Sequence, residues 1–198
     1  MKRILILTMI ELSFLTGCDK LRQFREVEES FVVIDLHGEE FCSEVMTNKE
    51  YRIMSENELL ECNNEGFTLI YKHELSSESE NVNLYIRLCG NAPYETGVRY
   101  HFPSDSTSVA DYSTARISLT DDDRIQHYYA LDGWVVLDAV NEVYAESDKE
   151  KRLKFYRVDG RFGFTAVEEH SGKIIEITDG AFCNTMFLPK TGMTSVAK

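Results

Sequence analysis

The chain has 198 residues, of which 28% are charged and 43% are hydrophobic. This balance excludes a disordered chain, a collagen and a membrane protein with several spans, and the length indicates one domain. Lys and Arg total 21 against 34 Asp and Glu, which gives a formal net charge of −13. Because a protein that follows a phosphate backbone needs a basic face, we expect no nucleic-acid partner.

The first eighteen residues have the pattern of a secretory leader. A basic start at residues 1–3 is followed by an apolar run over residues 4–14 and by Leu-Thr-Gly-Cys at residues 15–18. The run is too short for a stable transmembrane span. Its ending resembles a bacterial lipobox, in which the cysteine is acylated and becomes the new N-terminus, so we expect lipidation of Cys18. Glu11 departs from this pattern, since a carboxylate weakens insertion. The alternative is a cytosolic protein with an apolar first strand.

These features predict three segments: a lipoprotein signal peptide over residues 1–17, a lipidated tether over residues 18–30 and one β domain over residues 31–198. Residues 20–30 are polar and charged, as a tether between lipid and a folded domain should be. Two or three acyl chains anchor a protein stably without a transmembrane helix.

After residue 30 the hydrophobic pattern has a period of two, which is typical of half-buried strands. Residues 168–172 are polar and contain Gly, so they are expected to form a hairpin loop, and Asp179-Gly180 is expected to form a turn. The expected strands are residues 31–36, 40–45, 67–73, 81–88, 97–102, 114–119, 125–130, 134–138, 153–158, 161–167, 173–179 and 181–187.

No long amphipathic helix is expected between these strands. Residues 57–62 are expected to make a helical turn or two, and residues 141–152 a long loop. Alternation with one wet face implies antiparallel pairing. The predicted fold is therefore all-β, either an antiparallel β-sandwich or a calycin-like barrel of about 8–12 strands in a single domain.

The cysteines suggest a disulfide framework. Besides Cys18 there is an even set of four: Cys42, Cys62, Cys89 and Cys183. Disulfides persist in the compartment that the leader implies, so we expect at least one bridge. Three pairings are open, and the one that we favour joins Cys42 to Cys62 and Cys89 to Cys183. The alternative is four reduced, buried cysteines.

The sequence contains none of the common catalytic or nucleotide-binding motifs, so we assign no catalytic residue, cofactor or metal ligand. The carboxylates of Asp121, Asp122 and Asp123 would suit a hard cation such as Ca²⁺, but a charged hairpin turn explains this run equally well. Aromatic side chains gather in the middle third, where they could stack on a sugar or an apolar ligand, or belong to the core. They are Tyr94, Tyr100, Phe102, Tyr112, Tyr128, Tyr129, Trp134 and Tyr144.

Three segments carry a resemblance. Residues 37–41 read His-Gly-Glu-Glu-Phe after an apolar strand, residues 160–166 read Gly-Arg-Phe-Gly-Phe-Thr-Ala, and residues 177–182 read Ile-Thr-Asp-Gly-Ala-Phe. In this order they resemble a group of small lipoproteins, common in Bacteroidetes-type bacteria and known only as domains of unknown function. The resemblance implies an envelope location and a β-rich fold, and it brings no catalytic residues.

We therefore expect a non-enzymatic, lipid-anchored envelope protein that binds a ligand, a glycan or another envelope protein. The alternatives are a glycan-directed hydrolase with unidentified carboxylates and a structural subunit that pairs through edge strands. Asp19 follows Cys18, as in the inner-membrane retention signal of enteric bacteria. That rule belongs to enteric sorting rather than to bacteria of the resembling group, so we favour the outer membrane over the inner one.

Overall fold

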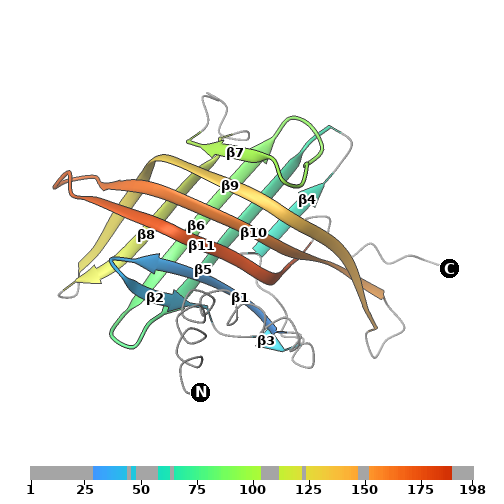
Figure 1. Ribbon diagram of the computed structural model, residues 1–198, viewed down its shortest axis with the longest axis horizontal. Coiled ribbons are helices and arrows are strands. Elements are labelled where there is room, and N and C mark those ends of the chain that lie inside the picture. The colour runs from blue at the N-terminus through green and yellow to red at the C-terminus, as the bar shows by residue number, and fades with distance from the viewer. Residues whose placement is uncertain are drawn as a thin grey trace, which may run out of the picture.

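The computed structural model describes residues 29–43, 46–47, 58–62, 65–103, 112–121, 124–146 and 152–188. Within these ranges the regular elements are eleven β-strands (Figure 1). They are β1 (Glu29–Leu36), β2 (Glu39–Cys42), β3 (Met46–Thr47), β4 (Glu58–Cys62), β5 (Phe67–Ser76), β6 (Asn81–Gly90), β7 (Arg99–Phe102), β8 (Thr114–Asp121), β9 (Arg124–Glu146), β10 (Arg152–Glu168) and β11 (Ile174–Phe187).

Eight of the strands form a closed antiparallel barrel. The order around the wall is β10, β11, β1, β2, β5, β6, β8 and β9, and β9 pairs back with β10 to close the ring. The short strands are additions to this wall: β3 pairs with β1, β4 with β5, and β7 with β9. The all-β prediction is confirmed, and closure of the ring selects the barrel over the sandwich.

Neighbouring strands of the barrel share the fewest paired residues between β2 and β5, where Cys42 and Ser76 are the single pair in register. Strand β4 covers the rest of this seam. It pairs with β5 along its length, and its Leu60 N–H donates to the carbonyl of Leu188 at 2.8 Å. The helical turn expected at residues 57–62 is therefore wrong. Leu60 is fully buried at the seam, so its tertiary partners decide its conformation.

The core consists of the inward side chains of the strands. On β6 these are the alternating apolar residues Val82, Leu84, Ile86 and Leu88, all at most 1% exposed, as the period-two pattern predicts. Large side chains fill the interior, and seven aromatic ones are less than 2% exposed: Phe41, Tyr71, Phe102, Tyr128, Phe162, Phe182 and Phe187. The inward-facing residues form one hydrophobic cluster.

Several strands are longer than predicted. Residues 125–130 and 134–138 belong to one strand, β9, which continues to Glu146 and so replaces much of the loop expected at residues 141–152. Strand β10 likewise unites residues 153–158 with 161–167. Irregular register rather than a turn accommodates the bends, with shifts next to Gly160 and between Thr165 and Ala166.

The turn expected at Asp179-Gly180 is absent, because β11 passes straight through it. Gly180 lies directly opposite Phe162 on β10, and a Cβ at Gly180 would collide with the Phe162 ring. The glycine is therefore explained by close approach of an aromatic ring, and not by a positive φ angle. The same pairing of glycine with a cross-strand Phe occurs at Gly90 with Phe67 and at Gly133 with Phe102 and Phe164.

The predicted hairpin loop differs in outcome from that turn. Residues 169–173 connect β10 to β11, close to the polar loop expected at residues 168–172. A second hairpin, between β1 and β2, was not predicted. His37 and Gly38 connect β1 to β2 with φ angles of 58° and 81°, the left-handed region that a two-residue hairpin turn requires. The Gly38 N–H donates to Asp35 Oδ1 at 3.0 Å, which holds this turn.

Strand β1 begins at Glu29, two residues before the predicted start of the β domain. Ser30 is 5% exposed, and its hydroxyl oxygen accepts the N–H of Met186 from β11 at 3.1 Å. The Thr185 hydroxyl donates in turn to the carbonyl of Phe31 at 2.8 Å. The first and last strands of the barrel are thus joined through buried side-chain hydrogen bonds as well as through the ladder.

Candidate functional site

The outer face of the barrel carries apolar side chains on β9 and β11. Ile125 is 65% exposed, Leu131 53%, Tyr129 39% and Ile174 59%. We call these four residues the outer stripe. Successive side chains of a strand point to opposite faces of the sheet. Tyr128 of β9 points inward and is fully buried, so Ile125, Tyr129 and Leu131 lie on the outer face.

Register brings the members of the outer stripe together across strands. Tyr129 pairs with Val167 of β10, and Val167 pairs with Ile174 at the start of β11. Leu131 falls at the register shift between Ala130 and Asp132, where β9 has one residue more than β10. Such a bulge bends the strand and re-aims its side chains. Register thus places Tyr129, Val167 and Ile174 in one row across β9, β10 and β11, whereas Ile125 pairs with Thr120 of β8.

Cationic side chains border the outer stripe. Arg116 of β8 is the cross-strand partner of Tyr129, and its guanidinium lies over the ring of Tyr85 at 5.7 Å from the centroid. Arg124 directly precedes Ile125, and Lys173 directly precedes Ile174. Acidic residues adjoin the same positions: Asp121 pairs with Arg124, Asp132 directly follows Leu131, and Glu176 lies two residues after Ile174. The border therefore carries charges of both signs.

A Ser–His pair lies in the same face. The Ser118 hydroxyl and His127 Nδ1 are 2.8 Å apart across β8 and β9, and the His127 ring contacts the edge of Tyr129 with centroids 6.4 Å apart. Ser118 is only 7% exposed. This hydrogen bond fixes the imidazole beside the outer stripe, and the pair has a structural role in the wall.

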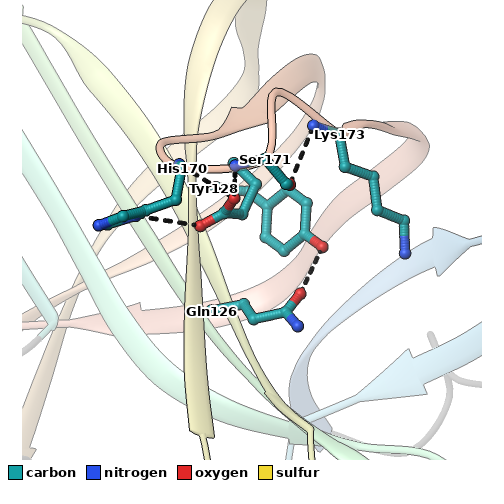
Figure 2. Close-up of polar contacts among 6 residues, drawn as sticks. Gln126, Tyr128, His170, Ser171 and Lys173 are labelled. Atoms are coloured by element: carbon teal, nitrogen blue, oxygen red, sulfur yellow. Dashed lines mark hydrogen bonds and ion pairs between the residues drawn. The ribbon is translucent and has the colours of Figure 1, made fainter.

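The hairpin loop between β10 and β11 adjoins the outer stripe through Ile174. There the Glu168 carboxylate accepts the backbone N–H groups of His170, at 3.0 Å, and of Ser171, while His170 Nδ1 lies 3.4 Å from Glu168 Oε1 (Figure 2). Hydrogen bonding from Ser171, and then from the His170 N–H, holds the pKa of Glu168 at about 2 instead of its usual 4.5. The ionised carboxylate thus organises the loop.

Beneath this loop Tyr128 and Gln126 form a partly buried polar pair on β9. The Tyr128 hydroxyl donates to Gln126 Oε1 at 2.8 Å, and Tyr128 is the cross-strand partner of Glu168 (Figure 2). Because the phenol has a partner within its own strand, Tyr128 can stay fully buried without an unsatisfied donor.

Of the predicted site residues, Cys18 and the acids Asp122 and Asp123 lie outside the described residues. Asp121 ends β8 and pairs with Arg124 at the start of β9. In the part of the chain that the structure describes, no group of three His, Cys, Asp or Glu residues is placed to hold a metal ion. Lipidation of Cys18 and cation binding by residues 121–123 both stay predictions.

The predicted disulfide is not found, because none of the four cysteines is bonded to another in the structure. Cys42 pairs with Ser76 at one end of β5 and Cys62 with Phe67 at the other, about 30 Å away along the strand. Cys89 and Cys183 lie on β6 and β11, which are four strand positions apart in either direction around the barrel. A disulfide needs Cα atoms within about 7 Å, so neither favoured pair can form.

The predicted aromatic cluster divides between core and surface. Phe102 and Tyr128 are buried, and Tyr94 and Tyr100 pack against the core. Trp134 lies under the guanidinium of Arg99 at 4.6 Å from its ring centroid. Tyr129 alone of the cluster belongs to the outer stripe. The aliphatic members were not predicted, although the alternation of β9 could have placed Ile125 opposite to Tyr128.

Comparison with known proteins finds no relative of this chain. No family model, no curated protein and no solved structure matches it. Within the described ranges, no helix is long and apolar enough to cross a membrane. The outer stripe and its border are therefore the candidate site on physical grounds alone.

Proposed function

We propose that this chain is a lipid-anchored bacterial envelope protein of non-enzymatic type, which binds another envelope component through its outer stripe. The lipobox-like Leu-Thr-Gly-Cys at residues 15–18 and the resemblance to small envelope lipoproteins support the anchor. They also favour an envelope location, with the outer membrane preferred over the inner one.

The exposure of the outer stripe carries the binding part of this proposal. Three aliphatic side chains that are more than half exposed, gathered on one wall, are a surface that a partner can cover with a gain in free energy. The interior is a less suitable binding site, because large aromatic side chains occupy it. Binding at the outer wall needs no rearrangement of this core.

Mass spectrometry of the protein from the membrane fraction of its source organism tests the anchor. We expect an acylated N-terminal peptide beginning at Cys18, metabolic labelling by an alkyne analogue of palmitate, and loss of both in the Cys18→Ser variant. A protein that still begins at Met1 and stays in the soluble fraction would contradict the proposal.

A panel of envelope and extracellular glycans tests the non-enzymatic part. We expect no turnover by the purified protein. Turnover that a single Asp→Ala or Glu→Ala change abolishes would establish the glycan-directed hydrolase instead. Analytical ultracentrifugation separates the remaining alternative, since a structural subunit that pairs through edge strands would form higher oligomers.

A further inference from the structure

We infer that the outer face of β5, β6, β8 and β9 carries a second binding site, and that its ligand is an acidic polysaccharide, a glycan chain whose sugars bear negative charges. The site is one row of four side chains, Lys72, Tyr85, Arg116 and Tyr129, which we call the cation–tyrosine row. It is separate from the contact proposed for the outer stripe, with which it shares only Tyr129. It does not depend on the proposed lipid anchor.

The members of the cation–tyrosine row are direct neighbours across four consecutive strands of the wall (Figure 1). Lys72 pairs with Tyr85, and Arg116 pairs with Tyr85 on one side and with Tyr129 on the other. Each member directly follows a residue that is at most 1% exposed, so strand alternation directs all four outward. Neighbouring strands lie about 4.8 Å apart, so the row extends about 14 Å across the sheet.

The two cations of the row have no acidic partner. In the ranges that the structure describes, neither the Lys72 nor the Arg116 side chain forms an ion pair or a hydrogen bond. The Arg116 guanidinium lies 5.7 Å from the centroid of the Tyr85 ring, which is within the range of a cation–π contact. Cation and ring thus hold each other in place, and the positive charge is left for a ligand.

Acidic residues lie beside the row rather than in it. Glu74 follows Lys72 by two positions on β5, and Glu61 of β4 is the cross-strand partner of Thr68, four positions before Lys72. The chain as a whole has 34 acidic and 21 basic residues. Two neighbouring cations without a carboxylate on such a chain give a local positive potential, and this potential complements an anionic ligand.

The other side chains favour a glycan among the possible anions. Tyr85 is partly exposed and Tyr129 is 39% exposed, and a tyrosine ring offers an apolar surface for a sugar together with a polar hydroxyl. The adjacent row consists of Asn83, Ser118 and His127. Asn83 is exposed, and the bond from Ser118 to Nδ1 of His127 leaves the imidazole Nε2 for a sugar hydroxyl. A nucleic acid is less suited, because its binding depends on many phosphate contacts and the row supplies two cations.

Isothermal titration calorimetry tests the inference on the full chain, purified in a nonionic detergent. The probes are a pentamer of galacturonic acid, a sulfated pentamer of glucose and, as the neutral control, maltopentaose. We expect at least one acidic pentamer to bind at least tenfold more tightly than maltopentaose in 50 mM NaCl, and its affinity to fall as the salt concentration rises.

Matched variants locate the site. Lys72→Ala and Arg116→Ala should each weaken binding of the acidic pentamer about tenfold, because each removes a charged hydrogen-bond donor. Tyr85→Leu keeps an apolar side chain but removes the ring, and should weaken binding about fivefold. Arg99→Ala is the control, since it removes the same charge from an exposed position outside the row. We expect it to change the affinity less than twofold, and circular dichroism checks the fold of every variant.

Four results would overturn the inference. The first is that neither acidic pentamer binds. The second is that Arg99→Ala weakens binding as much as Arg116→Ala, which would show an effect of net charge alone. The third is that a decamer of thymidylate or of glutamate binds as tightly as the glycan and is insensitive to Tyr85→Leu, which would show a surface for anions in general. The fourth is that Ile174→Ser, in the outer stripe but outside the row, abolishes binding, which would assign the glycan to the outer stripe.

Discussion

Gly180→Ala tests how the wall of the barrel is packed. A Cβ at this position would meet three ring atoms of Phe162, the farthest at 2.7 Å, which is well inside van der Waals contact. The ring has little freedom to move, because Phe162 is fully buried and its centroid lies 4.9 Å from that of Phe182. Overpacking of a core typically costs about 1–3 kcal/mol.

Part of this cost is offset in the unfolded chain. Replacing glycine by alanine reduces the conformational entropy of the unfolded state and stabilises by about 0.4–1 kcal/mol where the backbone is compatible. We therefore expect Gly180→Ala to lower the free energy of unfolding by about 1–2 kcal/mol. For a chain of this length the corresponding fall in Tm is about 5 °C, measured by calorimetry or by thermal circular dichroism.

A double-mutant cycle with Phe162→Ala isolates the cause. Without any side-chain atom beyond Cβ at position 162 the collision disappears, so Gly180→Ala should become neutral or slightly stabilising in the Phe162→Ala background. Gly163→Ala is the matched control, because its nearest atoms would lie at 3.1–3.4 Å and its cost should be smaller. If Gly180→Ala costs the same in both backgrounds, the glycine is required by its backbone conformation and the packing argument fails.

Three further predictions concern polar groups. The pKa of Glu168 is about 2 in the folded protein, against an ordinary value of 4.5. The stability that the ionised carboxylate contributes is therefore present above about pH 4.5 and is lost as the pH falls toward 2. The Glu168→Gln variant should show a flatter dependence of Tm on pH in this range. Ser30→Ala leaves the buried N–H of Met186 without its acceptor, so urea titration should show a loss of about 1–3 kcal/mol, and no loss would mean that water replaces the hydroxyl. Burial, followed by the charge of Glu40, raises the pKa of the Cys42 thiol, so alkylation of the folded protein at pH 8 should be slow at Cys42 and faster in Glu40→Gln; equal rates would exclude the charge effect.

Strand identity could be predicted from local patterns where one face is buried and the other is wet. The alternation of apolar and polar residues on β6 predicts its buried residues correctly. The alternation on β8 likewise predicts that Ala115 and Ile117 are buried. The polar loop predicted at residues 168–172 was also recognisable, since a chain reversal depends on a few adjacent residues. All these features repeat within a few residues along the chain.

The outer stripe was harder to predict, because an exposed aliphatic residue in a strand has the same sequence signature as a buried one. Ile174 directly precedes the buried Ile175, and only the position of the neighbouring strands shows that nothing in the described barrel covers Ile174. The disulfide prediction failed for a similar reason. An even number of cysteines allows all of them to form disulfides. Whether two cysteines can bond depends on their Cα separation, which is set by the order of the strands around the wall.

The all-β class, the antiparallel pairing and most of the side chains that point inward follow from local patterns of the chain, because a period of two is a local property of each strand. Three features depend on how the strands assemble: the sheet closes between β9 and β10, residues 58–62 become β4, and Gly180 continues β11 next to the Phe162 ring. Each of these depends on contacts between residues far apart in the chain. Glycine in particular signals either a turn or a close cross-strand neighbour, and the neighbour is defined only once the strands have paired.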